Sequence, residues 1–249
     1  MKIAVITLSV QGARVAQRLC AAWPQARLFR HGREFASIVK LTRQIFRRYN
    51  GLVYVAPCGV VVRAIAPVLE HKTTDPAVVV LDVGARYAVS LLSGHEGGAN
   101  RLALEVANVL GAEPVISTTT EAMKNLIVGV GCRRGAAAAQ IEAAVREALR
   151  RVGAGVEEVR WLASASLKAN EAGLLEAAER LGVPLRFISA DEICSTAKRF
   201  RRSKFVTEKV KLPAVAEPSA LLAGRRTQLL LPKIIVQSVT VAVARESCL

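Results

Sequence analysis

Short runs of β-branched and aliphatic residues alternate with longer segments of helical periodicity from the first residue onward. Strands are expected at residues 2–8, 27–29 and 52–55, with helices at 13–22 and 35–49 between them. Consecutive strand–helix units build mainly parallel sheets that carry helices on both faces. The alternation therefore predicts an α/β fold of the three-layer α/β/α type. With 52% hydrophobic residues among 249, the chain can bury the cores of one or two such domains.

The first half continues with elements of the same kinds. They are expected as a short helix at 60–66, strands at 77–81 and 87–92, a helix at 100–110 and a strand at 114–116. Asp82-Val83-Gly84 between the two middle strands is typical of a hairpin turn, so one strand pair should be antiparallel and the sheet mixed. Gly111 is expected to end the last helix as its C-cap.

The pattern restarts after a polar stretch at residues 118–124. The second half is expected to hold strands at 126–131, 159–162, 185–188, 229–231 and 239–244, and helices at 136–151, 171–181 and 217–223. A polar stretch between two complete strand–helix series is typical of a domain boundary. We expect two three-layer α/β/α domains with mainly parallel, mixed sheets, at residues 1–122 and 123–249.

Both halves are strongly basic. The net charge is +15, and division after Met123 gives 14 basic against 8 acidic residues, then 21 against 12. A positive field attracts polyanions, which include nucleic acids, membrane surfaces and metabolites with many carboxylates. Aromatic residues make up only 4% and do not interleave with a basic run, so we expect no nucleic-acid partner. Seven basic residues between Lys198 and Lys211 keep that alternative open.

The sequence shows neither a membrane-span pattern nor a metal-ligand pattern. No apolar run reaches the roughly 18–20 residues that cross a bilayer, and residues 1–6 read as a strand rather than a signal peptide. We therefore expect a cytoplasmic protein without membrane contact. Five cysteines are widely scattered, and His31, His71 and His95 lack the spacing that places two ligands on one helical face. Free thiols and no metal site are expected.

Two polar segments flank strands in the first half. Gly59 opens the expected helix at 60–66, where backbone N–H groups favour an anion, and Arg63 can add a bidentate guanidinium. An ordinary strand–helix turn with a surface arginine explains the same residues. Lys72, Thr73 and Asp75 offer a cation, a hydroxyl and a carboxylate before a strand, although Asp75 followed by proline also reads as a turn.

The densest segment is Ser93-Gly94-His95-Glu96-Gly97-Gly98-Ala99-Asn100. Its three glycines, Gly94, Gly97 and Gly98, let the backbone approach a ligand closely. His95 is the best candidate for a general acid or base, because an imidazole titrates near neutral pH. A histidine that merely caps the following helix is the alternative. Glu96 is a second catalytic candidate or a first-turn residue that complements the helix dipole, and Asn100 is a candidate N-cap.

In the second half, Gly131-Cys132-Arg133-Arg134-Gly135 joins a strand to a helix. Two arginines and free amides at a helix start form the strongest anion cradle in the sequence. The spacing is not that of a dinucleotide-binding loop, and Cys132 has no base beside it in sequence. Lys168 follows the next strand, where it can contact an acidic ligand or simply face solvent. Glu217 lies in a loop that enters a helix.

Taken together, these segments resemble the CbiG family of cobalamin biosynthesis. The likeness rests on six ordered segments, at residues 59–67, 72–80, 90–100, 129–135, 164–171 and 215–220. It covers nearly the whole chain and both expected domains. Longer members carry a middle segment, whereas here Thr120 is followed almost at once by the strand at 126–131.

The resemblance implies a cobalt-precorrin-5A hydrolase, which opens the ring A δ-lactone of a cobalt corrinoid and releases acetaldehyde. It implies no separate cofactor, since the substrate brings the cobalt, and leaves open other cobalamin-pathway enzymes and further copies of the chain as partners. His95 and Glu96 would be catalytic. The substrate-binding residues would be Gly59, Arg63, Lys72, Thr73, Asp75, Gly94, Gly97, Gly98, Asn100, Gly131, Arg133, Arg134, Lys168 and Glu217. A non-catalytic corrinoid carrier of the same pathway and a basic nucleic-acid-binding protein are the alternatives.

Overall fold

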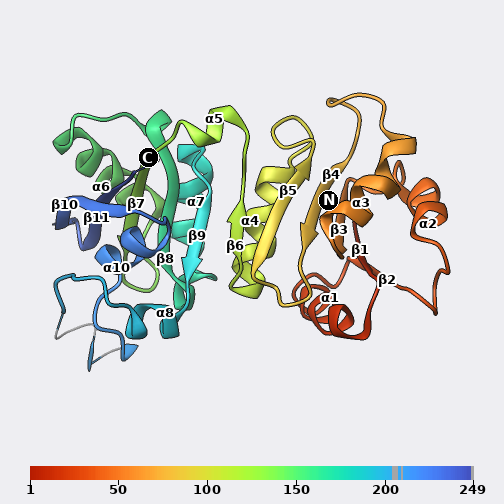
Figure 1. Cartoon of the computed structure of the whole chain (residues 1–249). Coiled ribbons are helices and arrows are strands. Elements are labelled where there is room, and N and C mark those ends of the chain that lie inside the picture. The colour runs from red at the N-terminus through yellow and green to blue at the C-terminus, as the bar shows by residue number, and fades with distance from the viewer. Residues whose placement is uncertain (204–206, 209, 248–249) are drawn as a thin grey trace. The chain divides into compact units, whose positions relative to one another are not determined.

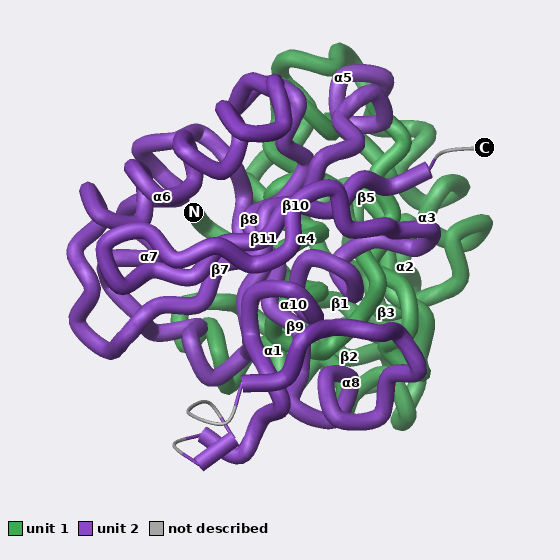
Figure 2. The backbone as a smooth tube through the Cα atoms, turned by 90° about the vertical axis from the view of Figure 1, so that its left-hand side faces the viewer, with its two compact units in different colours: residues 1–118 green, residues 119–249 purple. Residues whose placement is uncertain are grey.

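The computed structural model describes residues 1–203, 207–208 and 210–247. The chain forms two compact units, Met1–Thr118 and Thr119–Leu249, which Figure 2 shows in different colours. The domain boundary that we expected after residue 122 falls at the end of a short helix, α5 (Thr119–Ala122), which is the first element of the second unit.

The first unit is built on a six-stranded mixed sheet in the order β2-β1-β3-β4-β5-β6. Its strands are β1 (Ile3–Thr7), β2 (Arg27–Arg30), β3 (Gly51–Val55), β4 (Ala77–Leu81), β5 (Tyr87–Leu92) and β6 (Glu113–Val115). The strands β1 to β4 are parallel, whereas β5 forms an antiparallel hairpin with β4 and pairs in parallel with β6. The hairpin expected at Asp82 is confirmed, and it reverses the direction of β5 and β6.

Helices cover both faces of this sheet (Figure 1). They are α1 (Val10–Ala22) and α4 (Ala99–Leu110) on one face, and α2 (Ile38–Ile45) and α3 (Cys58–Ile65), followed by the short η1 (Ala66–Val68), on the other. Successive residues of a strand point to opposite faces, so Val53 packs in the α1/α4 core and Tyr54 in the α2/α3 core. The three layers expected for this half are confirmed.

The second unit has a five-stranded mixed sheet in the order β10-β11-β7-β8-β9. Its strands are β7 (Leu126–Gly131), β8 (Val159–Ala165), β9 (Leu185–Ile188), β10 (Thr227–Val236) and β11 (Val239–Glu246). The strands β7, β8 and β9 are parallel, and β11 runs antiparallel to both β7 and β10. The loops after β7 and β8 therefore lie beside each other at the carboxyl end of the parallel strands.

This sheet too lies between helices. The helices are α6 (Ala138–Arg151) and α7 (Ala172–Leu181) on one face and α10 (Ala216–Leu222) on the other, with η2 (Val156–Glu158), η3 (Ser166–Lys168) and α8 (Ala190–Ser195) in connections. On β7, Val128 and Val130 pack in the α6/α7 core, whereas Gly129 between them faces α10. A Cβ at Gly129 would overlap the carbonyl of Ala216, so the close approach of α10 requires glycine.

Several helix ends follow local sequence signals. The Ser9 hydroxyl caps α1 by accepting the backbone N–H of Gly12 at 3.0 Å. Gly111 and Gly182 end α4 and α7 with φ angles of 72° and 65°, and the C-cap role expected for Gly111 is confirmed. In the residues that the structure describes, no helix is long and apolar enough to cross a membrane.

Candidate functional site

The reversed direction of β5 divides the expected site residues of the first unit into two groups. Val55 at the end of β3 pairs with Leu81 at the end of β4, whereas Leu92 at the end of β5 pairs with Val78 near the start of β4. The loop after β3 therefore lies at one end of the sheet, and residues 71–76 and 93–100 lie at the other. At about 3.3 Å per residue the two ends are roughly 16 Å apart. Residues 93–100 follow the carboxyl end of β5, and because β5 is antiparallel to β4 they lie at the end of the sheet where β4 begins.

Residues 93–100, here called the His95 loop, contact the segment before β4. The Nζ atom of Lys72 lies 3.0 Å from Oε1 of Glu96. A Cβ placed on Gly97 would lie 3.1 Å from the carbonyl oxygen of Asp75, so backbone meets backbone there and a side chain would not fit. The structure thus brings nine of the expected residues to one end of the sheet: Lys72, Thr73, Asp75, Gly94, His95, Glu96, Gly97, Gly98 and Asn100.

Charge in the His95 loop is concentrated on Glu96 and its neighbours. The hydrogen bond from the Lys72 ammonium lowers the pKa of Glu96, and the Lys72 and His95 charges act in the same direction. Glu96 is therefore an ionised carboxylate near neutral pH. His95 is exposed and makes no hydrogen bond to another described residue, so its imidazole is available to a ligand.

Asn100 holds the His95 loop in place rather than capping α4. Its side-chain Oδ1 accepts the Ser90 hydroxyl at 2.8 Å, and its Nδ2 donates to Thr118 Oγ1 at 2.9 Å. The N-cap is Gly98, with a φ of 83° that favours glycine. The Asn100 amide therefore joins β5, α4 and the segment that follows β6, and its expected N-cap role is wrong.

The sequence did not single out Ser93, which begins this loop. Ser93 is only 7% exposed and has a φ of 57°, which is unusual for a residue with a Cβ. Its hydroxyl is buried and has no hydrogen-bond partner among the described residues. Neither the burial nor the backbone angle has a signal in the sequence beyond the position directly after a strand.

The segment before β4 is held by its own contacts. The carboxylate of Asp75, which is buried, accepts the backbone N–H of Glu70 at 3.1 and 3.2 Å. The Thr73 hydroxyl lies 2.8 Å from His71 Nδ1. Asp75 thus closes a turn, and the side chain of Lys72, which is 71% exposed, is free to extend into solvent.

Gly59 and Arg63 lie at the opposite end of the sheet. Both are on α3, and the Arg63 guanidinium donates to the Gly59 carbonyl at 3.2 Å. The N–H of Val60, which we expected to face a ligand, instead donates to the Pro57 carbonyl at 3.0 Å.

An open depression follows β1 and β2 and has a volume of about 370 Å³. It is lined by Leu8, His31, Ala36, Ser37 and Ile38.

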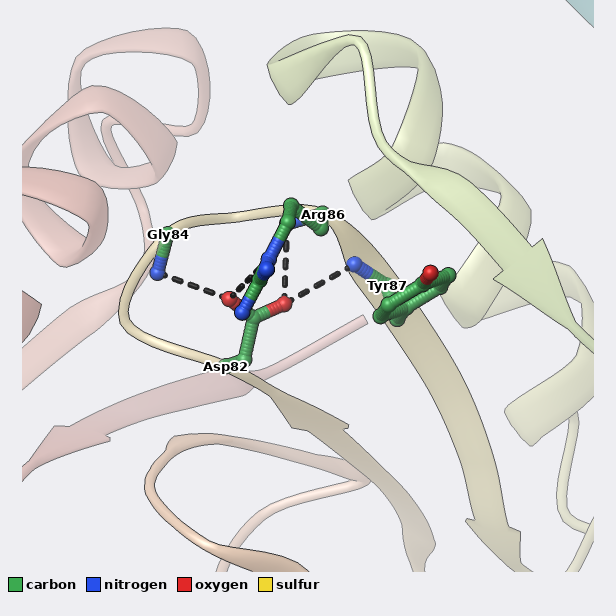
Figure 3. Close-up of polar contacts among 4 residues, drawn as sticks. All are labelled: Asp82, Gly84, Arg86 and Tyr87. Atoms are coloured by element: carbon green, nitrogen blue, oxygen red, sulfur yellow. Dashed lines mark hydrogen bonds and ion pairs between the residues drawn. The ribbon is translucent and has the colours of Figure 1, made fainter.

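Asp82 is a hairpin residue. Its carboxylate accepts the backbone N–H groups of Gly84, Arg86 and Tyr87 at 2.8, 2.9 and 3.0 Å (Figure 3). Partial burial alone would raise the pKa of Asp82, but these three hydrogen bonds outweigh it and lower that pKa below its ordinary value. The carboxylate therefore stabilises the turn between β4 and β5.

In the second unit, the expected anion cradle already holds a carboxylate of the chain itself. Glu171 accepts the backbone N–H of Gly135 at 2.7 Å with Oε1 and the Lys168 ammonium at 3.0 Å with Oε2. The side chains of Lys168 and Glu171 are 12% and 11% exposed. Burial would raise the pKa of Glu171, but the Gly135 and Lys168 hydrogen bonds lower it. Lys168 is thus a buried partner of Glu171 and does not face solvent.

The start of α6 is covered as well. A Cβ at Gly173 would overlap the carbonyl oxygen of Ala136 and lie 3.3 Å from the backbone nitrogen of Ala138, the first residue of α6. We expected free amides at this helix start, but three of them donate within the chain: Gly135 to Glu171 Oε1, Ala136 to the Arg133 carbonyl and Ala137 to Gln140 Oε1. The side chains of Arg133 and Arg134 in this segment are exposed and have no ion-pair partner among the described residues.

Glu217 is an internal anchor. It is 1% exposed, and its two oxygens accept the backbone N–H groups of Arg201 at 2.6 Å and Lys233 at 2.9 Å. Both acceptors of the carboxylate are therefore engaged. Within the basic run, Lys198 also bonds internally, to the Leu221 carbonyl and the Thr227 hydroxyl, while Lys204 and Lys209 lie outside the described residues.

The cysteines that the structure describes are free thiols, and Cys248 lies outside the described residues. Burial raises the pKa of Cys132, and the nearby Glu171 acts in the same direction against Lys168. A protonated thiol is a poor nucleophile. No cluster of three or more His, Cys, Asp or Glu side chains suited to a metal ion occurs in the described part of the chain.

Fold and site together define a two-unit α/β protein with an exposed imidazole on a glycine-rich loop and two open arginines on the second unit. Comparison with known proteins identifies the family to which this α/β protein belongs. The family model for the cobalamin synthesis G N-terminal domain matches residues 40–121, and the model for the cobalamin synthesis G C-terminus matches residues 126–244. The chain belongs to this family, CbiG, as the resemblance of its six segments implied.

Three curated relatives extend the match. A cobalt-precorrin-5A hydrolase of Priestia megaterium is 26% identical over 352 positions, which cover 97% of this chain and 94% of the relative. A cobalt-precorrin-5A hydrolase of Salmonella typhimurium is 39% identical over 48% of this chain and 36% of its own length. Protein CobE of a Sinorhizobium species is 34% identical over 51% of this chain and 83% of its own length. The first alignment is longer than the 249 residues here, so that relative carries residues that this chain lacks.

Proposed function

We propose that this protein is a cobalt-precorrin-5A hydrolase of anaerobic cobalamin biosynthesis, which opens the ring A δ-lactone of its substrate and releases acetaldehyde. The observation that carries the proposal is the match of both CbiG domains, in order, together with a relative of that name whose alignment covers 94% of its length. The exposed His95 on a glycine-rich loop supplies the proton-transfer group that such a reaction needs.

The proposed chemistry has three requirements. Water must add to the lactone carbonyl, the resulting oxyanion must be stabilised, and the ring oxygen that leaves must receive a proton before the two-carbon unit is lost. In our proposal His95 takes the proton from water and returns it to the leaving oxygen. Backbone N–H groups of Gly97 and Gly98 donate to the oxyanion, since neither bonds to a described residue. Glu96, ionised and paired with Lys72, favours the protonated imidazole that forms during transfer.

The substrate carries many acetate and propionate groups, which suits a chain of net charge +15. Exposed Arg133 and Arg134 are the strongest candidates for binding them, and Lys72 and Arg63 are the candidates in the first unit. Lys168 and Glu217 then act indirectly, by holding the loops that carry the contacts. Thr73, Asp75 and Asn100 likewise shape the loops, whereas Gly59 lies on α3 and Gly131 at the end of β7. The proposal includes a cytoplasmic protein, no separate cofactor and no nucleic-acid partner, with cobalt arriving inside the substrate.

Product analysis tests the proposal. The full chain is incubated anaerobically with cobalt-precorrin-5A, and the corrinoid product and acetaldehyde are both quantified. A hydrolase forms one acetaldehyde for each ring-opened corrinoid. Tight binding of the corrinoid without acetaldehyde would show a carrier instead. Absence of corrinoid binding, with strongly salt-dependent binding to DNA or RNA, would show a nucleic-acid-binding protein.

A further inference from the structure

Ser93 is held in an arrangement that is unfavourable in two independent ways. Its φ of 57° is a left-handed backbone conformation that a serine adopts at a cost and a glycine adopts freely. Its hydroxyl is buried without a hydrogen-bond partner among the described residues, which is a second cost. Both costs would disappear if the residue were glycine. A serine at this position therefore lowers the stability of the fold, and its hydroxyl makes no hydrogen bond among the described residues that would offset this cost.

The surroundings of Ser93 place it beneath the candidate catalytic loop. A Cβ on Gly97 would overlap the Cβ of Ser93, so only a glycine can lie over this side chain. The carbonyl oxygen of Ser93 accepts the N–H of Ala99, the first residue of α4, at 3.1 Å. Ser93 thus contacts both the amino end of the twelve-residue helix α4 and the backbone of Gly97.

Two other serines near the sheets use their hydroxyls in hydrogen bonds. Ser90, on β5, donates to Asn100 at 2.8 Å, and the fully buried Ser164 on β8 donates to the Val130 carbonyl at 2.8 Å. Each of these serines has a structural partner that explains its hydroxyl. Ser93 has none among the described residues, although it is as enclosed as a core residue. Ser219 on α10 shares the unpartnered, buried hydroxyl, but of these two serines only Ser93 also has a positive φ.

We infer that Ser93 is a further catalytic residue of the proposed reaction, on which this inference rests. When the substrate displaces residues 94–98, the Ser93 hydroxyl donates a hydrogen bond to the oxyanion that forms at the lactone carbonyl, beside the Gly97 and Gly98 N–H groups. No bond to Ser93 forms or breaks. Water supplies the new oxygen, the ring C–O bond breaks, and His95 carries the proton. Of the loop's glycines, Gly98 has open space around it and a φ of 83°, and it is the position at which the loop backbone can turn.

The test uses three variants of the full chain: Ser93→Ala, Ser93→Gly and, as a control, Ser164→Ala. Removing one oxyanion donor lowers kcat about 100-fold, so we expect this loss in both Ser93 variants with KM changed less than about threefold. The same two variants should melt at a higher temperature than the wild type, with the larger rise for glycine. Ser164→Ala removes the same atom from a bonded serine and should melt at a lower temperature.

The outcomes separate the two proposals. If the wild type converts cobalt-precorrin-5A and Ser93→Ala converts it equally fast, the inference about Ser93 is overturned while the proposed function stands. A Ser93→Ala protein that melts below the wild type also overturns it, because the hydroxyl would then have a structural partner. A wild type that binds cobalt-precorrin-5A without releasing acetaldehyde contradicts the proposed function itself.

Discussion

The carboxylate of Glu171 accepts the backbone N–H of Gly135 across 36 residues of sequence, at 2.7 Å, and so joins the start of α7 to the loop after β7. Replacing Glu171 by Ala removes this bond and leaves the Lys168 ammonium unpaired at 12% exposure. We expect Glu171→Ala to lower the free energy of unfolding by about 2–4 kcal/mol, measured by chemical denaturation. The matched control is Glu147→Ala on α6, where the carboxylate pairs with exposed arginines and should matter little. Equal effects of the two variants would contradict the role of Glu171.

Asp82 should make stability depend on pH. Because its pKa is lowered in the folded protein, the stabilisation is present above the ordinary pKa of about 4 and is lost as pH falls through the folded-state value. We expect Asp82→Asn to cost about 1–3 kcal/mol at pH 7, since three backbone N–H groups lose a charged acceptor. The difference from wild type should shrink in denaturation curves taken at progressively lower pH. Arg86→Ala removes only an exposed partner of Asp82 and serves as the control. If the difference in the free energy of unfolding between Asp82→Asn and the wild type were the same at pH 3 as at pH 7, the prediction would be refuted.

Gly173 should tolerate no side chain. A Cβ there would overlap the Ala136 carbonyl, so Gly173→Ala forces α7 and the start of α6 apart. We expect a loss of about 1–3 kcal/mol or more in the free energy of unfolding. Gly59→Ala is the matched control, because Gly59 lies within a helix and the nearest atom to its new Cβ would be 3.5 Å away on a flexible arginine. That variant should gain about 0.4–1 kcal/mol. If both variants changed the free energy of unfolding in the same direction, close packing at Gly173 would not explain the effect of Gly173→Ala.

Arg133 and Arg134 should act on substrate affinity. Their exposed guanidiniums can bind peripheral carboxylates, which contact the substrate equally before and during the reaction. We expect the double change to alanine to raise KM about tenfold and to leave kcat within about threefold of wild type. The control is Arg150→Ala with Arg151→Ala at the other end of α6, where both arginines pair with Glu147. A tenfold loss of kcat at unchanged KM would show that Arg133 and Arg134 contribute to the chemical step instead.

Much of the fold followed from residue patterns. Strands at Ala77–Leu81, Tyr87–Leu92 and Leu126–Gly131 have the bounds expected from their β-branched runs. The helix expected at 35–49 is shorter, since α2 begins only at Ile38, after a turn at residues 31–36 that the periodicity does not reveal. The helix α8 was not predicted, although Ser189 and Glu192 form a capping box at its start.

The candidate site was harder to predict, because its arrangement depends on contacts distant in sequence. The segment that carries His95 could be found from its glycines, but its place at the amino end of β4 follows from the hairpin at Asp82. The filled cradle at Gly135 depends on Glu171, whose partner lies 36 positions away. The destabilising effect of Ser93 depends on its positive φ and on its burial, and no local sequence pattern predicts either of them.

The most direct test of the account is the single-turnover rate of cobalt-precorrin-5A conversion by His95→Ala, with His31→Ala as the matched imidazole deletion at the other end of the sheet. A general acid or base commonly contributes 10²–10⁴-fold. We predict that acetaldehyde release slows by about that factor in His95→Ala, while the corrinoid still binds and His31→Ala keeps the wild-type rate. If His95→Ala releases acetaldehyde as fast as the wild type, the catalytic role of the His95 loop is contradicted.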